Sequence, residues 1–256
     1  MPRDERIYPN WDDGLFTWHL YRYVWALPHA YGKTVLDVGC GSGYGSHLLS
    51  GVAKKVVGVD YDPEAIDYCR RQYGDHPNLQ FIVMDATVLG FAAETFDLAV
   101  SFEVFEHITP ELGDAYLSQL RRALRTGGNA LISTPNHVIE KLWGTYHHGH
   151  INSVSPAEFR RRLRHHFRVV RLFGQKPVET KLKRFLKMLD VFHLRHRLFP
   201  RETRVRLDLL LSGGRPSYRA DLSTVEINQK LIHQSSVLLA LCVKGEDQIA
   251  RGNVPR

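Results

Sequence analysis

The stretch TVLDVGCGSGYGS, residues 34–46, joins a short apolar run to a turn with alternate glycines. The apolar run, Thr34 to Val38, has the composition of a strand buried on both faces. Gly39, Gly41 and Gly43 follow it directly, and a helix-length segment comes next. Glycines at such a turn adopt positive φ and let a ligand approach the backbone, while the first turn of a helix offers N–H groups without partners. The stretch therefore predicts a strand, a loop and a helix that together hold a nucleotide cofactor.

The same alternation continues along the chain. Short apolar runs at 34–38, 55–59, 79–83, 96–101 and 129–134 are separated by helix-length segments at 45–51, 63–74, 110–125 and 156–166. Two further strand-like runs lie at 167–174 and 236–243. Repeated strand and helix units of this kind predict an α/β fold, a doubly wound and mostly parallel sheet.

About sixty residues separate the last two strand-like runs, which is long for a connection inside one domain. We interpret residues 175–232 as a helical, basic insertion, or lid, within a single domain that spans residues 1–256. Helices are expected near 182–195 and 202–211.

The charge of the chain is concentrated near this insertion. The whole chain carries +7, but residues 160–206 hold 16 Lys or Arg against three acids, a local +13, so the remaining residues carry −6. Such a segment favours anionic partners: a phosphate backbone, a nucleotide-sugar diphosphate or a lipid headgroup at a membrane surface. A solvated lid that also contacts a second copy in a homodimer explains it equally well. Nucleic acid is less favoured, because the chain has no recognised RNA-binding module.

Cys40, Cys69 and Cys242 are odd in number and far apart, which predicts neither a disulfide framework nor paired metal ligands. The first ten residues are charged and lack an apolar segment. We expect a cytoplasmic protein.

The residues in and after the glycine turn indicate which kind of nucleotide cofactor it can bind. Asp60, about twenty residues after the turn, suits the two ribose hydroxyls of a nucleotide. A dinucleotide fingerprint would need glycine where Tyr44 or Ser46 stands, so a pyrophosphate cradle is disfavoured. Asp37 at the start of the turn suits a cofactor with a cationic amino-acid group better than one with a phosphate there, since a carboxylate and a phosphate repel each other.

Five stretches resemble class I S-adenosylmethionine-dependent methyltransferases in order and spacing: VLDVGCGSGYGS (35–46), VVGVDYDPEAI (56–66), FIVMDA (81–86), FDLAVSFEVFEHI (96–108) and LRTGGNALISTPN (124–136). The resemblance implies a Rossmann-like sheet of seven strands with an antiparallel last strand near 236–243. It also implies S-adenosyl-L-methionine as the cofactor and S-adenosyl-L-homocysteine as its product.

The resemblance implies roles for individual residues around that cofactor. Gly39, Gly41 and Gly43 would line its methionine and ribose parts, Asp60 would hold the ribose, Tyr61 would pack on adenine, and Asp85 with Ala86 would read the adenine edge. Asp37 and Glu103 would also lie beside the cofactor, and Arg22, on an N-terminal helix, would pair with its carboxylate. Structural alternatives stay open: a loop cap for Asp37, a helix cap for Asp85, a half-buried ring for Tyr61 and a solvated Arg22.

The segment after the run at 96–101 carries Glu103, Glu106 and His107, which share one face if the segment is helical. In one interpretation His107 is the general base that deprotonates the methyl acceptor. In another, the E-x-x-E-H pattern with a later His such as His150 resembles the metal site of small-RNA 3′-terminal 2′-O-methyltransferases, and it occurs also in ubiquinone-pathway enzymes. In a third interpretation, His107 has only a structural role, as a packing or capping residue. We predict His107 as the base and no metal ligand.

The loop at 135–155 carries Tyr146, His147, His148 and His150, which we expect to contact the substrate. The stretch HINSVSPAEFRRRL (150–163) resembles a bacterial branch associated with cell-surface glycans. The prediction is an O-methyltransferase for a polar small-molecule or glycan acceptor, which anionic groups would suit. The alternatives are a metal-dependent RNA 2′-O-methyltransferase and a non-catalytic cofactor-binding regulator.

Overall fold

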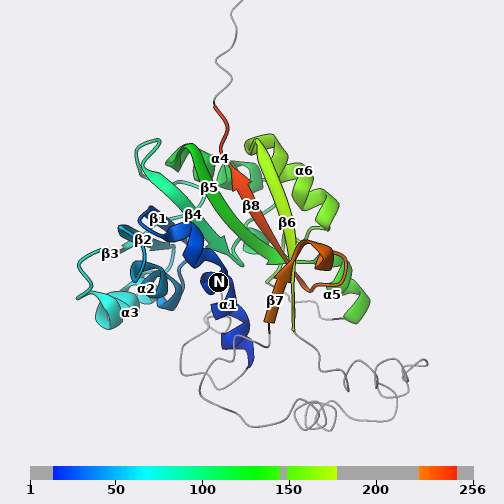
Figure 1. Cartoon of the computed structure of the whole chain (residues 1–256), viewed down its shortest axis with the longest axis horizontal. Helices are drawn as coiled ribbons and strands as arrows, with labels where there is room; N and C mark the ends of the chain where they lie inside the picture. Colours follow the sequence, from blue (N-terminus) through cyan, green and yellow to red (C-terminus); the bar gives the residue numbers. More distant parts are fainter. Residues whose placement is uncertain (1–13, 145–148, 178–224, 247–256) are drawn as a thin grey trace, which may run out of the picture.

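A single mixed sheet organises the chain, for which a computed structural model describes residues 14–144, 149–177 and 225–246 (Figure 1). The strands are β1 Thr34–Val38, β2 Lys55–Asp60, β3 Leu79–Val83, β4 Phe96–Phe102, β5 Leu124–Pro135, β6 Val169–Pro177, β7 Val225–Asn228 and β8 Val237–Val243. Their order across the sheet is β3-β2-β1-β4-β5-β8-β6-β7. The first five strands are parallel, β8 is antiparallel to both β5 and β6, and β7 is antiparallel to β6.

The predicted α/β fold with an antiparallel last strand is confirmed, but the predicted number of seven strands is wrong. The eighth strand is β7, four residues at the sheet edge that pair with the end of β6 from Gly174 to Pro177. So short an edge strand carries too little apolar periodicity to be recognised in a sequence.

The ends of the expected helical insertion therefore differ from the prediction. Residues 175–177 complete β6, and residues 225–231 form β7 and a 3₁₀ turn, η4 (Gln229–Leu231). The helices expected near 182–195 and 202–211 lie outside the described residues.

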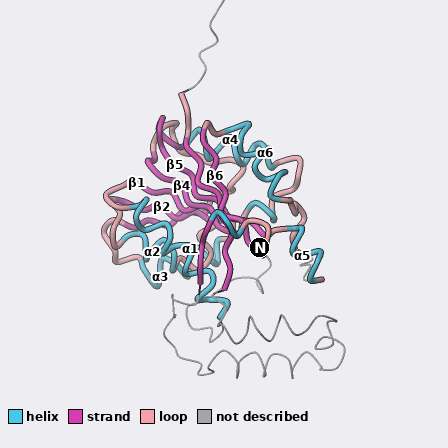
Figure 2. The backbone as a smooth tube through the Cα atoms, turned by 45° about the vertical axis from the view of Figure 1, so that its right-hand side comes forward, coloured by secondary structure: helices cyan, strands magenta, loops and turns pink. Residues whose placement is uncertain are grey.

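Helices cover both faces of the sheet (Figures 1 and 2). On one face pack α1 (Gly14–Ala30), α2 (Tyr44–Ser50) and α3 (Pro63–Tyr73), and on the other α4 (Gly113–Ala123) and α6 (Pro156–His166). Caps set where two of them begin: the Asp62 side chain accepts from Glu64 N–H, and Ser155 accepts from Glu158 N–H. A short helix, α5 (His137–Trp143), follows β5.

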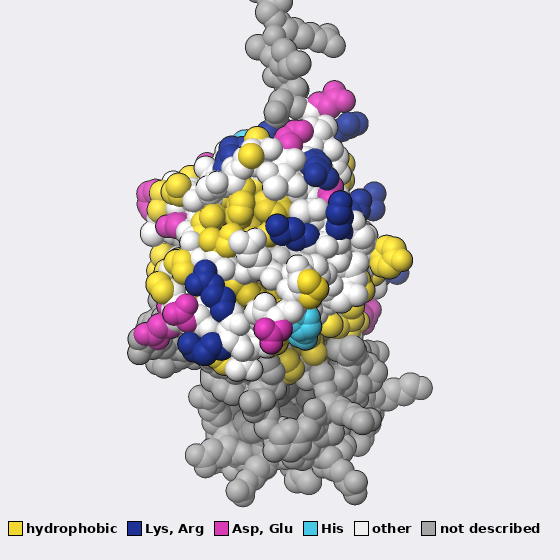
Figure 3. Space-filling model, turned by 90° about the vertical axis from the view of Figure 1, so that its left-hand side faces the viewer, with side chains coloured by type: hydrophobic (Ala, Val, Ile, Leu, Met, Phe, Trp, Pro, Cys, Tyr) yellow, Lys and Arg dark blue, Asp and Glu magenta, His cyan; other side chains and the backbone are white. Residues whose placement is uncertain are grey.

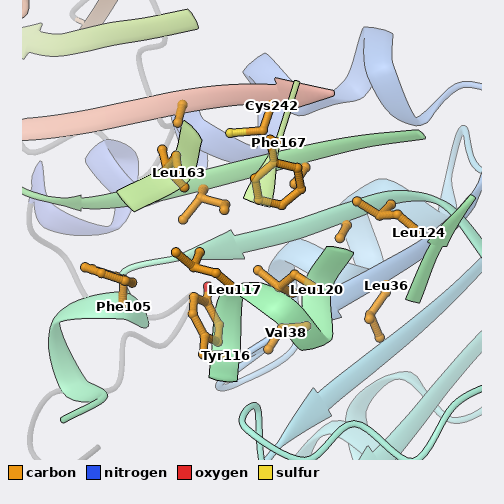
Figure 4. Packing of buried hydrophobic residues seen from close by; sticks show 14 of the residues in the cluster. Leu36, Val38, Phe105, Tyr116, Leu117, Leu120, Leu124, Leu163, Phe167 and Cys242 are labelled. Carbon is orange, nitrogen blue, oxygen red and sulfur yellow. The ribbon is translucent and has the colours of Figure 1, made fainter. Parts of the chain in front are cut away.

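The core consists of two apolar clusters, one on each face of the sheet. Figure 4 shows Leu117 and Leu120 of α4 and Leu163 of α6 packed with Val38 of β1. Neighbouring residues of a strand face opposite sides of the sheet, so Leu36 of β1 belongs to this cluster. Val35 belongs to the cluster on the other face, with residues of α1, α2 and α3. Strands buried on both faces explain why the sequence shows near-continuous apolar runs.

The helix expected at 110–125 is shorter at both ends than predicted. It ends at Ala123, and β5 begins at the next residue. Gly127, with a φ of 79°, lies within β5, near a register shift between β4 and β5. The positive φ explains the glycine, because other residues are strained there.

The three cysteines are buried free thiols. Within the described residues, no helix combines the length and apolar character needed to cross a bilayer. Figure 3 shows one face of the surface, on which acidic and basic side chains alternate around apolar areas.

Candidate active site

A cavity of about 320 Å³ opens at the carboxyl ends of β1, β2, β3 and β4. This is the edge where α/β sheets of this kind bind ligands, beside the point where the strand order reverses. The predicted site residues in its wall are Gly39, Asp60, Tyr61, Asp85, Ala86, Glu103 and His107. Residues that lie far apart in the sequence thus meet at one place.

Gly39 shapes the floor of the cavity. Its φ is 73°, and a Cβ at this position would overlap the side chain of Val104. Gly41 has a φ of 55°, but no atom lies within 4 Å of the place where its Cβ would be. The turn thus needs glycine for backbone conformation at both positions, and at Gly39 also for close packing.

Asp60 connects the end of β2 to the glycine turn. Its carboxylate accepts hydrogen bonds from the N–H groups of Gly41 (3.0 Å) and Asp62 (3.1 Å), and only 8% of the residue is exposed. Tyr61 is 56% exposed, which leaves its ring accessible beside the cavity. Asp85 accepts from both the N–H and the hydroxyl of Thr87 at 2.7 Å, so it caps a turn as well as lining the cavity.

Asp37, Gly41 and Gly43, which we expected beside the cofactor, are not in the lining of this cavity. Asp37 is fully buried in β1, where Ser46 (2.6 Å) and Tyr23 (3.3 Å) donate hydroxyl hydrogen bonds to it. This burial raises the pKa of Asp37 to about 7. Gly43 caps α2 with a φ of 78°, and a Cβ there would lie 2.7 Å from the sulfur of Cys69. Asp37 and Gly43 therefore stabilise the turn through buried contacts and do not form the surface of the cavity.

Arg22 of α1 is not solvated, since only 1% of it is exposed, and it too lies outside the lining of the cavity. One of its terminal nitrogens, Nη2, lies 3.6 Å from a carboxylate oxygen of Glu103 and has no hydrogen-bond partner. The guanidinium thus stands directly behind a residue of the cavity wall. A buried donor without a partner is costly, which makes Arg22 a candidate to bind an anionic group.

Gln175 of β6 is a residue that the sequence reasoning missed. Its side-chain oxygen accepts from Arg22 Nε at 2.7 Å, and its amide donates to the carbonyl of Trp18 at 2.6 Å. The signal in the sequence is slight, a polar residue near the end of a mostly apolar strand. Gln175 therefore joins α1 to β6, in the antiparallel part of the sheet.

The predicted helical face for Glu103, Glu106 and His107 is wrong. β4 ends at Phe102, Glu103 has a φ of 55°, and only Phe105–His107 forms a 3₁₀ turn, η2. Ser133 holds Glu103 by donating to its carboxylate at 2.6 Å. A positive φ at a residue with a side chain is strained, and such strain is frequent where a chain serves a site.

Glu106, His107 and His150 nevertheless lie close together. Each offers one ligand atom, and these atoms lie within 4.8 Å of one another. Glu106 is 1% exposed, and one of its oxygens accepts from the Thr134 hydroxyl at 3.1 Å, while the other has no partner. Burial, with the charge of Glu103 nearby, raises the pKa of Glu106 well above its usual range.

Hydrogen bonds orient the two imidazole rings of this cluster. His107 Nδ1 lies 3.1 Å from the carbonyl oxygen of Gly149, and His150 Nδ1 lies 3.1 Å from a carboxylate oxygen of Glu140. Glu140, which is buried on α5, was also missed, because its distance from His150 depends on how the intervening loop folds. Tyr146, His147 and His148, the other expected substrate contacts, lie outside the described residues.

Residues 35–128 match the sequence family described as "Methyltransferase domain". This range contains the glycine turn, Asp60, Asp85, Glu103 and His107.

Curated relatives match part of the chain. One is a "Probable S-adenosylmethionine-dependent methyltransferase" of Mycobacterium tuberculosis, which is 30% identical over 158 residues, 61% of this chain and 54% of the relative. Another is a fatty-acid O-methyltransferase of Mycolicibacterium smegmatis, 34% identical over 111 residues, 43% of this chain and 39% of the relative. The chain thus spans about half the length of the first relative, or less for the second.

Solved structures match more of the chain at lower identity. A chain from the complex of the Haloferax volcanii Trm112 methyltransferase activator with a methyltransferase has a TM-score of 0.61 at 22% identity. The match covers 92% of this chain and 93% of that one. At this identity the likeness shows the fold.

Proposed function

The chain belongs to the class I S-adenosylmethionine-dependent methyltransferase superfamily, and on that premise we propose that it transfers the methyl group of S-adenosyl-L-methionine to a hydroxyl group. The observation that carries the proposal is the single cavity that Gly39, Asp60, Asp85 and Glu103 line together with His107. Cofactor-binding groups and a titratable imidazole in one cavity are what a group transfer requires.

The residues present fit this cofactor. Asp60, which lines the cavity, would accept from the ribose hydroxyls, and the exposed ring of Tyr61 would pack on adenine. Gly39, which has no side chain, would admit the ligand close to the backbone. Glu103 offers a carboxylate to the cationic end, and Arg22 behind it offers a guanidinium to the cofactor carboxylate. S-adenosyl-L-methionine supplies the activated methyl group, so the protein has to align the acceptor and remove its proton.

His107 is the proposed general base. Its Nδ1 faces the carbonyl of Gly149, an arrangement in which Nδ1 carries hydrogen and Nε2 is the basic nitrogen. Its ring lines the same cavity as Glu103. His107 can therefore accept the acceptor's proton without leaving the cofactor site.

The proposed acceptor is a polar small molecule or glycan in the cytoplasm. Support for oxygen as the accepting atom comes from the imidazole base and from the similarity to a relative named a fatty-acid O-methyltransferase. The buried free thiols suit a reducing compartment.

Calorimetry with S-adenosyl-L-homocysteine tests the cofactor site. Asp60→Ala removes a charged acceptor and should weaken binding by about tenfold or more, since a hydrogen bond to a charged group contributes about 1.5–3 kcal/mol. Asp67→Ala, which changes an exposed acid on α3, is the matched control and should bind as the unchanged protein does. Absence of binding by the unchanged protein would end the proposal.

Transfer of labelled methyl to a panel of sugar nucleotides, glycans and RNA tests catalysis and acceptor. His107→Gln should lower kcat by about 10²–10⁴-fold with cofactor affinity retained. His166→Gln, on the partly exposed histidine that faces Asp114, is the control. Cofactor binding without transfer to any acceptor would instead favour a non-catalytic regulator.

A second candidate is metal-assisted methyl transfer, favoured by the cluster of Glu106, His107 and His150. Carboxylate and imidazole are a chemically reasonable ligand set for a divalent ion. With Nδ1 of each ring engaged, Nε2 is the nitrogen that each would use, and Glu140 would orient His150 as carboxylates orient metal-bound histidines. An ion here would keep the buried Glu106 ionised and orient the acceptor oxygen.

Titration of the EDTA-treated protein with Mn²⁺ and with Zn²⁺ by calorimetry tests this candidate. Glu106→Gln should abolish binding of the ion, whereas Glu111→Gln, an exposed acid outside the cluster, should not. Methyl transfer that survives both EDTA and Glu106→Gln would exclude the metal route and leave His107 as a base alone.

A further inference from the structure

A second concave surface, which we call the arginine groove, is lined by residues of α6 and by Ile232 and His233, which precede β8. It has a volume of about 540 Å³, and its lining includes three arginines and two histidines: Arg160, Arg161, Arg164, His165 and His233. None of its lining residues lines the cavity at Gly39 and His107, so it is a separate site.

Neighbouring acids neutralise only part of the positive charge in the groove. Glu158 is the nearest acid on α6, and it pairs with Arg161 (2.6 Å) and Arg162 (2.9 Å). No ion pair joins Arg160 or Arg164 to any part of the chain that the structure describes. Two like charges one helical turn apart destabilise a helix slightly, and a bound anion would relieve that repulsion.

The walls of the groove are held by the core. On α6, Phe159 and Leu163 are fully buried, which directs Arg160 and Arg164 outward. On the other wall, the carbonyl of Ile232 accepts from the Asn136 amide at 3.2 Å. The two sides therefore present their charges from fixed backbone positions.

The chemistry of the lining indicates the ligand. Guanidinium groups form paired hydrogen bonds with phosphate oxygens, and two of them can hold one phosphoryl group or two joined ones. Pro156 and Ile232 add apolar surface beside the charges, which suits the organic part of a phosphate ester. The groove also lies at the start of the basic stretch 160–206 in the sequence.

We propose that the arginine groove is a binding site for a phosphate-bearing ligand, distinct from the methyl-transfer cavity. Charge complementarity selects the phosphate, and the apolar residues contact the group that carries it. The same chemistry serves a soluble phosphate ester and an anionic lipid headgroup, and a binding experiment separates these sources.

The experiment uses the full-length protein and two probes. Calorimetry measures binding of inorganic pyrophosphate, and sedimentation measures binding to phosphatidylglycerol vesicles, with phosphatidylcholine vesicles for comparison. The test variant is Arg160→Ala/Arg164→Ala, which removes two cations that α6 does not need for packing. The control is Lys54→Ala/Arg71→Ala, which removes two exposed cations elsewhere.

We expect the test variant to bind pyrophosphate about tenfold more weakly or worse, and the control to bind it unchanged. Loss of vesicle binding in the test variant, with no pyrophosphate binding by any form, would assign the site to a lipid headgroup. If the test variant and the control behave alike with both probes, or neither probe binds, the proposal is wrong. S-adenosyl-L-homocysteine binding, measured in the same samples, should be equal in all forms and reports the other site separately.

Discussion

Gly39 and Glu103, both with positive φ, form adjoining parts of the cavity wall. Gly39 directly follows β1 and Glu103 directly follows β4, two neighbouring strands at the centre of the sheet. The space between them is partly filled by Val104, which lies against Gly39. The site thus depends on backbone conformation as much as on side-chain chemistry.

Gly39→Ala should destabilise the protein and abolish S-adenosyl-L-homocysteine binding. Positive φ costs about 1–2 kcal/mol with a side chain, and the overlap with Val104 adds to it. Gly41→Ala is a matched control, because its φ is 55° but its Cβ would meet no atom within 4 Å. Urea unfolding compares the two; equal losses would show that the contact with Val104 is unimportant.

Asp37 makes folding stability depend on pH. Its pKa is about 7 in the folded protein, against 3.8 for an unperturbed side chain, so the folded state binds the extra proton. Stability should therefore fall as pH rises from about 4 to about 7, by up to about 4 kcal/mol. In Asp37→Asn this fall should disappear. The free energy of unfolding of the variant should therefore increase relative to that of the parent protein as pH rises. Urea unfolding from pH 5 to pH 8 measures it; a difference independent of pH would contradict the assignment.

At the scale of elements, side-chain contacts join the helix α1 to the strand β6. Arg22 on α1 binds Gln175 on β6, and Gln175 binds the carbonyl of Trp18 on the same helix. Trp25 of α1 also packs edge-on against Phe173, with ring centroids 5.3 Å apart. This contact sets the position of Arg22 behind Glu103.

Gln175→Leu should cost about 2–3 kcal/mol of stability, because it leaves the buried guanidinium without a partner on Nε. It should also weaken S-adenosyl-L-homocysteine binding, whereas Gln175→Glu, which keeps an acceptor, should retain it. Gln72→Leu on α3, exposed to solvent, is the control. Thermal unfolding and calorimetry give the two readouts; unchanged ligand affinity in Gln175→Leu would separate Arg22 from the cofactor site.

At the scale of the whole molecule, the cofactor should stabilise the domain, since its proposed contacts come from the ends of four strands and from α1. At a concentration a hundred times Kd, a ligand adds about 2.7 kcal/mol, which corresponds to roughly 5–10 °C in Tm for a domain of this size. Thermal unfolding with S-adenosyl-L-homocysteine at one fixed concentration should show this rise in the unchanged protein and a clearly smaller rise in Asp60→Ala. A rise of the same size in both would place the ligand elsewhere.

Much of the fold follows from local signals. The strand β1 and the helices α3 and α6 have clear limits in the sequence, because Pro63 and Pro156 open the helices and Asp62 and Ser155 cap them. The candidate cofactor residues Gly39 and Asp60 were found for the same reason, since Gly39 directly follows a strand and Asp60 ends one. Asp85, two residues after β3, was assigned from the family resemblance. Their proximity follows from the parallel sheet, which brings strand ends to one edge.

What the sequence by itself determined is the order of strands and helices and the residues at the carboxyl ends of the strands, since periodicity and turn chemistry are local. Only the tertiary structure decided that β7 adds an eighth strand and that Asp37 is buried beneath the turn. It also decided that Gln175 reaches Arg22 and that Glu140 reaches His150. These outcomes depend on how separate segments pack, and a hydrogen bond across 153 positions of sequence leaves no periodic pattern in the chain.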